Sequence, residues 1–196
     1  MDTRLLAEFS PLDVQTSEGG LYNPYAPDAP LKIYATGIRN AFDLLWHSNG
    51  ELYVPTNGSA AGGNTPTSDP EDSLYVPQHR AIDKDSSQHL NIPALDQVSP
   101  TQSDWLYRIE EGRYYGHPNP RRGEYILNRG LRDVNDERYA LVQADPNFHE
   151  AGLAYDFQNN KSPNGIIEYT SDAFGGLLKG KILVVRYSQN DDIMIL

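Results

Sequence analysis

The chain has 196 residues, and 16 Lys and Arg stand against 27 Asp and Glu, giving a formal net charge of −11 at pH 7. The absence of cysteine excludes disulfides, thiolate metal sites and thiol catalysis. The acidic balance argues against nucleic acid as a main partner, and no apolar run reaches the about 18 residues that a membrane span needs.

Short segments rich in Tyr, Val, Ile and Leu alternate with clusters of Gly, Pro, Asn and Asp, a pattern typical of strands and turns. The predicted strands are 31–36, 41–47, 51–55, 105–110, 152–157, 165–170, 181–187 and 192–196. Ser48-Asn49-Gly50 predicts a tight hairpin with a type I′ turn, and Glu110-Glu111-Gly112 predicts a second turn. These short strands favour an all-β fold.

Two parts of the chain, 40–54 and 164–185, share the order Asn, apolar run, Gly, apolar run. Four-stranded units that repeat every 40–50 residues or so are typical of β-propeller blades, although any two hairpins could share so loose an order. Segment 56–103 is rich in Gly, Pro, Ser, Asp and Asn, and it predicts a long loop insertion across one face of the fold. Residues 1–30 are interpreted as a connecting or closing segment, and 31–196 as blades.

Three segments together resemble the soluble quinoprotein glucose dehydrogenase family, the glucose/sorbosone dehydrogenase-like six-bladed β-propellers. These segments are Thr36-Gly37-Ile38-Arg39-Asn40-Ala41-Phe42-Asp43-Leu44, then Asp104-Trp105-Leu106-Tyr107 running to Gly116-His117-Pro118-Asn119, and finally Ser162-Pro163-Asn164-Gly165-Ile166 with Leu183-Val184-Val185. The resemblance implies a partial six-bladed propeller of about two and a half to three blades. It also implies a fragment of a sugar dehydrogenase that uses pyrroloquinoline quinone (PQQ) and calcium to pass hydride from a sugar to the quinone.

The resemblance implies a cofactor site and a metal site. Arg39 and Asn40 match the family's pair beside the quinone oxygens, where fixed donors stabilise developing negative charge. Lys161 and Arg186 fall where the family places cations against the carboxylates of PQQ. For calcium, Gly58 and Ser59 match main-chain ligands and Asp104 matches a carboxylate that closes the site. From the residues alone, Arg39, Lys161 and Arg186 could instead be solvated charges, and Asp104 a turn carboxylate that caps backbone N–H groups.

No catalytic residue is assigned, because none of the five histidines lies in the family's base motif, which would fall upstream of Met1. The isolated chain is therefore expected to be inactive, and His117 is interpreted as a packing or loop residue. The family is periplasmic or secreted, whereas residues 1–11 lack the features of a signal peptide.

Two other functions stay open. A non-catalytic propeller module could bind carbohydrate or a protein partner through Tyr114, Tyr115 and Tyr125. A lactonase-like metal hydrolase would need several carboxylate or amide ligands around one metal, and only Asp104 is a candidate.

Overall fold

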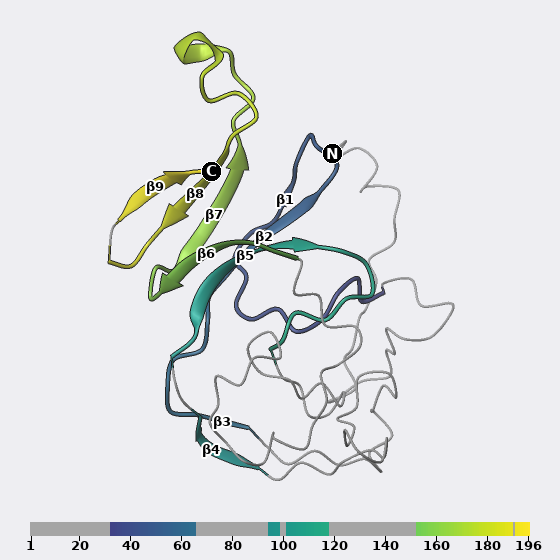
Figure 1. Cartoon of the computed structure of the whole chain (residues 1–196), viewed down its shortest axis with the longest axis vertical. Helices are drawn as coiled ribbons and strands as arrows, with labels where there is room; N and C mark the ends of the chain where they lie inside the picture. The colour runs from purple at the N-terminus through teal and green to yellow at the C-terminus, as the bar shows by residue number, and fades with distance from the viewer. Residues whose placement is uncertain (1–31, 66–93, 99–100, 118–151, 190) are drawn as a thin grey trace, which may run out of the picture. The chain divides into compact units, whose positions relative to one another are not determined.

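The computed structural model describes residues 32–65, 94–98, 101–117, 152–189 and 191–196. The chain divides into two compact units, Met1–Ile33 and Tyr34–Leu196, and every strand in Figure 1 belongs to the second. The described part is built from antiparallel sheets, as the all-β prediction required. No helix in these ranges combines the length and apolar character needed to span a bilayer.

A four-stranded antiparallel sheet has the order β1-β2-β5-β6. Its strands are β1 (Leu45–Trp46), β2 (Leu52–Thr56), β5 (Ser103–Ile109) and β6 (Leu153–Asn159). The pairing of β1 with β2 ends at Leu45 and Tyr53. Pro55 follows two residues later, and proline has no N–H to give to a ladder, which explains why β1 is short.

A three-stranded antiparallel sheet has the order β7-β8-β9. It contains β7 (Pro163–Glu168), β8 (Ile182–Arg186) and β9 (Asp192–Ile195). The loop between β7 and β8 contains a short 3-10 segment, η7 (Ala173–Gly176). Lys179 closes the base of this loop with a 2.7 Å ion pair to Asp172.

Apolar side chains pack on both faces of the four-stranded sheet. One face carries the buried cluster of Val54, Trp105, Tyr107, Ile109 and Tyr115. Leu106 and Phe157 lie in a second cluster, where they pack against Ile166, Ile182 and Val184 of the three-stranded sheet. Both faces of β5 are therefore covered, because neighbouring residues of a strand point to opposite faces and Asp104 to Tyr107 are all buried.

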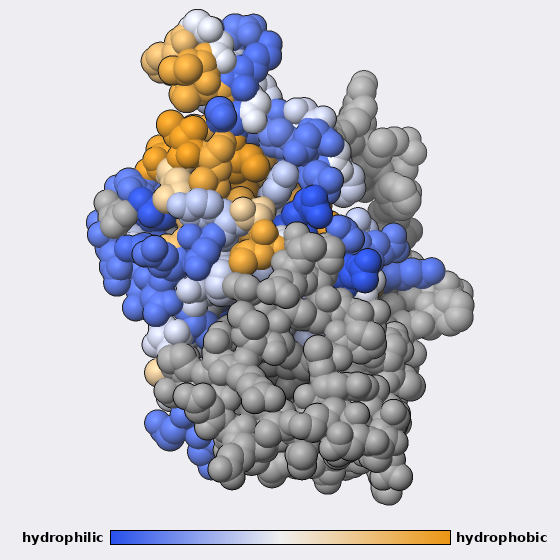
Figure 2. Space-filling view, viewed as in Figure 1, coloured by the Kyte–Doolittle hydropathy of each residue, from blue (hydrophilic) through white to orange (hydrophobic). Residues whose placement is uncertain are grey.

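The opposite face of the three-stranded sheet is apolar and exposed. Ile167 is 56 % exposed, Val185 45 %, Ile193 61 % and Ile195 50 %. The space-filling view shows these apolar residues as an orange region over β7, β8 and β9 (Figure 2). Both faces of this sheet are thus apolar, and within the described ranges only one of them is covered.

Antiparallel contacts tie the ends of the predicted long loop together. The N–H of Gln102 donates to the carbonyl oxygen of Ser59 at 2.8 Å, and the N–H of Ala61 donates to Oγ1 of Thr101 at 3.2 Å. Further along, β3 (Gly63–Thr65) pairs with β4 (Leu95–Val98). The sequence interpretation of 56–103 missed this two-stranded sheet, because Gly63-Asn64-Thr65 has no apolar alternation. Residues 66–93 lie outside the described ranges.

Six of the eight predicted strands are confirmed with shifted ends: 51–55, 105–110, 152–157, 165–170, 181–187 and 192–196. The prediction for 31–36 is wrong in the part that the structure describes, where only an isolated parallel bridge joins Thr36 to Tyr114. The prediction for 41–47 is too long. Only Leu45 and Trp46 form the strand, and Asp43 instead accepts backbone N–H groups from Leu44 and Ile166.

The hairpin at Ser48-Asn49-Gly50 is confirmed, but its turn is not type I′. A type I′ turn needs positive φ at both central residues, and of these three residues only Gly50 has one, at +89°. Gly50 donates its N–H to His47 O at 2.9 Å, which places Ser48 and Asn49 at the centre of the turn. The predicted turn at residues 110–112 is confirmed, with Gly112 at φ +73°.

Candidate functional site

Residues 34–37 run parallel to residues 112–117 and fix the position of Arg39. Thr36 donates its N–H to Arg113 O, Tyr115 donates to Thr36 O, and His117 donates to Gly37 O, at 2.8–3.0 Å. Gly37 has φ +74°, and a Cβ there would lie 2.4 Å from the ring of Tyr114. Glycine is therefore required where the chain turns from this pairing toward Arg39.

Arg39 is anchored through one end of its guanidinium group. Its Nη1 donates to Asn57 O at 3.0 Å and to Gly58 O at 2.7 Å. In the part of the chain that the structure describes, Nε and Nη2 make no hydrogen bond, so three N–H donors remain for a ligand. The side chain is half-buried, and the two hydrogen bonds of Nη1 fix one end of the guanidinium group.

Asp104 is 4 % exposed and accepts three backbone N–H groups. Gly58 donates to Oδ1 at 2.8 Å, while Lys161 and Ser162 donate to Oδ2 at 2.7 and 2.8 Å. These contacts match the alternative in which Asp104 caps backbone groups. They also join β2, β5 and the turn before β7, three parts of the chain that are far apart in sequence.

The peptide group between Asn57 and Gly58 lies between a cation and an anion. Its carbonyl accepts from Arg39, and its N–H donates to Asp104. Both contacts polarise this peptide in the same direction, so each hydrogen bond strengthens the other. A Cβ on Gly58 would lie 2.4 Å from Ser103 O, so only glycine allows this close approach of two backbones.

A small, partly open hollow lies beside Arg39. It is lined by residues that include Arg39, Gly58, Trp105, Tyr107, Gly116 and His117, and its volume is about 20 Å³. That volume holds one water molecule or a single oxygen-sized group of a ligand. The described residues could therefore contact the edge of a large ligand but could not enclose it.

His117 shares this hollow with Arg39. Its Nδ1 is buried and has no hydrogen-bond partner among the residues that the structure describes. Burial, followed by the nearby charge of Arg39, lowers the pKa of His117 to about 4, so the imidazole is neutral near pH 7. The sequence interpretation of His117 as a packing or loop residue did not place it beside Arg39, because only the pairing of 34–37 with 112–117 brings the two together.

Most of the predicted site residues lie in one connected region. Gly58 contacts both Arg39 and Asp104, and Lys161 donates its backbone N–H to Asp104. The carbonyl of Asn40, an exposed residue with φ +48°, accepts from the side chain of Asn57 at 3.1 Å. The fold thus brings these predicted residues together, and their roles as ligand-binding groups stay predictions.

The side chains of Arg186 and Lys161 have partners of their own. Arg186 forms a two-point ion pair with Asp192 on the neighbouring strand, at 2.7 Å from Nε to Oδ1 and 2.5 Å from Nη2 to Oδ2. This hydrogen bonding raises the pKa of Arg186. Lys161 Nζ donates to Oε1 of Gln189 at 3.0 Å. A cofactor carboxylate would have to compete with these contacts.

The oxygens predicted to bind calcium already accept hydrogen bonds. Gly58 O accepts from Arg39, Ser59 O accepts from Gln102, and both oxygens of Asp104 are used. Within the described ranges no group of three or more His, Asp or Glu side chains is placed to hold a metal. A calcium ion at these oxygens would have to share or displace the hydrogen bonds that they accept, and the calcium site stays a prediction.

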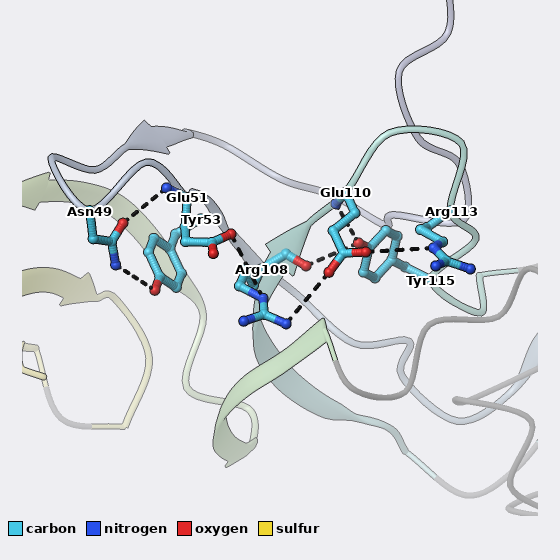
Figure 3. Close-up of polar contacts among 7 residues, drawn as sticks. All are labelled: Asn49, Glu51, Tyr53, Arg108, Glu110, Arg113 and Tyr115. Atoms are coloured by element: carbon cyan, nitrogen blue, oxygen red, sulfur yellow. Dashed lines mark hydrogen bonds and ion pairs between the residues drawn. The ribbon is translucent and has the colours of Figure 1, made fainter.

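A second polar cluster lies along β2, β5 and the turn that follows β5 (Figure 3). Arg108 lies between Glu51 and Glu110, with nitrogen–oxygen distances of 3.9 and 3.5 Å. The hydroxyl of Tyr115 donates to Arg108 O at 3.0 Å and accepts the N–H of Glu110 at 2.8 Å. Burial raises the pKa of Tyr115 to about 12, so the phenol stays neutral. Most groups in this cluster pair with one another, as in a structural network, whereas Nε of Arg108 is buried without a hydrogen-bond partner among the described residues.

Comparison of the chain with protein-family models, with curated proteins and with solved structures gave no significant match.

Proposed function

We propose that the chain is part of a β-propeller of the PQQ-dependent sugar dehydrogenase type and that Arg39 contacts the cofactor. The observation that carries the proposal is the anchored guanidinium of Arg39, which keeps three N–H donors directed to no other described group. Such fixed donors suit an acidic, planar ligand whose oxygens gain negative charge.

The packing of the sheets supports the propeller part of the proposal. The order β1-β2-β5-β6 is an up-and-down antiparallel sheet, and β7-β8-β9 is another. The two pack through Leu106, Phe157 and Val184, as neighbouring blades do. The number of blades and the closure of a ring are part of what is proposed.

The described residues fit PQQ only at its edge. Arg39 would donate to a quinone or carboxylate oxygen there, and Asn40, on the adjacent exposed position, would be a second donor. PQQ supplies, when bound, an electrophilic quinone that accepts hydride from a sugar carbon. The role of this chain's own residues is to bind and orient the acidic edge of PQQ. No residue of the chain is assigned as the catalytic base.

Titration of the whole chain with PQQ, followed by calorimetry with and without Ca²⁺, tests the proposal. We expect saturable binding that Arg39→Ala weakens by about tenfold or more, because charge-assisted hydrogen bonds are lost. Arg113→Ala is the matched control, since Arg113 is 42 % exposed and contacts Glu110. Absence of saturable binding, or equal affinity in the Arg39 and Arg113 variants, would contradict the proposal.

The alternative function, a propeller module that binds carbohydrate, relied on exposed tyrosine rings. Tyr114 is 0 % exposed and Tyr115 is 2 % exposed, so the prediction that they offer a stacking surface is wrong. Both rings are buried, that of Tyr115 in the cluster with Trp105, and Tyr125 lies outside the described ranges.

A further inference from the structure

The outer face of the three-stranded sheet is apolar and has no cover among the described residues. It carries Ile167 of β7, Val185 of β8, and Ile193 and Ile195 of β9, which are 45–61 % exposed. These side chains are neighbours, because Leu183 pairs with both Ile167 and Ile195, and Val185 pairs with Ile193. Soluble proteins rarely leave a contiguous apolar surface of this kind open unless it binds a partner.

Charges of opposite sign stand at the two ends of this outer face. Lys181 directly precedes β8, at the end next to the loop that contains η7, and Asp191 directly precedes β9, at the opposite end. Both residues are exposed, and neither side chain has a hydrogen bond or ion pair within the described ranges. They lie equally far, along their strands, from the paired residues Val184 and Met194.

This arrangement of charges is complementary to itself. A two-fold axis that lies between two such faces and runs across the strands reverses the strand direction of the second copy. The Lys181 end of each face then meets the Asp191 end of the other, so two opposite-charge contacts form at once, as an isologous interface requires. A two-fold axis along the strands would bring like charges together, which is unfavourable.

We propose that the outer face of β7, β8 and β9 is a self-association surface, occupied by a second copy of this chain whose strands run in the opposite direction. The other apolar faces of the two sheets are already used. One lies in the cluster between the sheets, and Ala35 and Ile38 pack against the other, so the outer face is the one left for its own counterpart. Arg39 takes no part in this surface, and the inference goes beyond the proposed function.

The size of the outer face sets the strength of the association. Its strands are four to six residues long, and at a spacing of about 4.8 Å they present a few hundred Å². The loop that contains η7 adds apolar surface, because Phe174 is 73 % exposed and Leu177 is 76 % exposed. A stable interface buries about 800 Å² on each partner, so we expect dimers at about 100 μM and monomers in dilute solution.

Sedimentation equilibrium of the whole chain, from about 1 μM to about 1 mM, tests the proposal. We expect a monomer–dimer equilibrium that Val185→Asp weakens by about tenfold or more, because the dimer would bury an unpaired charge. Glu111→Lys is the matched control, since Glu111 is exposed in the turn after β5 and should leave the equilibrium unchanged. Circular dichroism shows that each variant keeps its strands.

Charge reversal tests the direction of packing. Lys181→Asp alone and Asp191→Lys alone should each weaken the dimer by about tenfold, because like charges would then meet at both ends. Both substitutions in one chain should restore the dimer. An equal mixture of the two single variants should form a heterodimer, since every contact in it again joins opposite charges.

Two results would overturn the proposal. A chain that stays monomeric at about 1 mM would leave the outer face to another segment of the same protein, such as a further blade. A dimer that Val185→Asp does not weaken would lie elsewhere on the surface. Single reversals that weaken the dimer without rescue in the double variant or in the mixture would exclude the two-fold packing.

Discussion

The carboxylate of Asp104 accepts the backbone N–H of Lys161 at 2.7 Å, across 57 positions of sequence. With the N–H groups of Gly58 and Ser162, this contact makes one buried side chain the junction of three backbone segments. Hydrogen bonds to a charged acceptor are stronger than neutral ones, so this junction contributes directly to the stability of the fold.

Asp104→Asn should lower the free energy of unfolding by about 2–3 kcal/mol, because the amide NH₂ would face N–H donors and leave them unpaired. Chemical denaturation of the whole chain measures this loss. Asp172→Asn is the control, since Asp172 is 81 % exposed in its pair with Lys179, and it should change stability by less than about 1 kcal/mol. If Asp104→Asn removed only a Ca²⁺-dependent part of the stability, Asp104 would be a metal ligand and not a backbone cap.

Gly58→Ala should cost about 1–3 kcal/mol, because its Cβ would lie 2.4 Å from Ser103 O and 2.5 Å from Gln102 O. It should also weaken PQQ binding, since the carbonyl of Gly58 positions Arg39. Gly165→Ala is the matched control, because its nearest neighbour would be a side-chain atom 3.9 Å away and it should be tolerated. Equal stability of the two variants in thermal unfolding would show that β2 and β5 are not so close at Gly58.

The contact between Ser48 and Glu168 should make stability depend on pH on the acid side. The Ser48 hydroxyl and backbone N–H donate to Glu168 at 2.5 and 2.8 Å, and these bonds, the hydroxyl first, lower the pKa of Glu168. The ionised form is thus favoured in the folded state. The stabilisation is present above the ordinary carboxyl pKa and is lost as the pH falls through the lowered folded value.

Urea denaturation midpoints measured across acidic pH check this dependence. Ser48→Ala should flatten the acid-side slope in part, because the backbone N–H still donates to Glu168, and Glu168→Gln should flatten it further. Glu111→Gln, at an exposed turn, should leave the slope as it is. An unchanged slope in Ser48→Ala would mean that this contact does not stabilise the ionised carboxylate.

Val184 and Val185 are neighbours on β8 that face opposite sides of the sheet. Val184 is 0 % exposed in the cluster between the two sheets, whereas Val185 is 45 % exposed. Val184→Ala should cost about 2 kcal/mol through lost burial and a cavity, and Val185→Ala less than about 1 kcal/mol. Similar losses in both variants would show that the outer face is covered in solution.

The alternation of apolar residues made most strands predictable. Residues 165–170 and 181–187 carry enough Ile, Leu and Val to identify β7 and β8 from sequence. Residues 31–36 carry a similar pattern, but in their described part Ala35 packs against the cluster that contains Tyr115, and only an isolated bridge joins Thr36 to Tyr114. An apolar pattern predicts that a segment is buried, but it does not predict which segment its backbone pairs with.

The candidate site was predictable to the extent that local motifs define it. Arg39, Gly58 and Asp104 belong to recognisable segments, and the fold does bring them together. The contact of Arg186 with Asp192 and the burial of Tyr114 depend on packing across strands, which no local motif encodes. His117 becomes a candidate site residue only because residues 112–117 pair with residues 34–37, which lie far earlier in the sequence.

The backbone hydrogen bond between Gln102 and Ser59 brings together the two ends of the segment that separates them. The chain leaves the sheet and returns to it at the same point, next to the pairing of β2 with β5. Insertions and deletions in residues 60–101 would alter the closure entropy only slowly with length. This position is therefore one where evolution could exchange whole segments while the network of Arg39 and Asp104 is inherited unchanged.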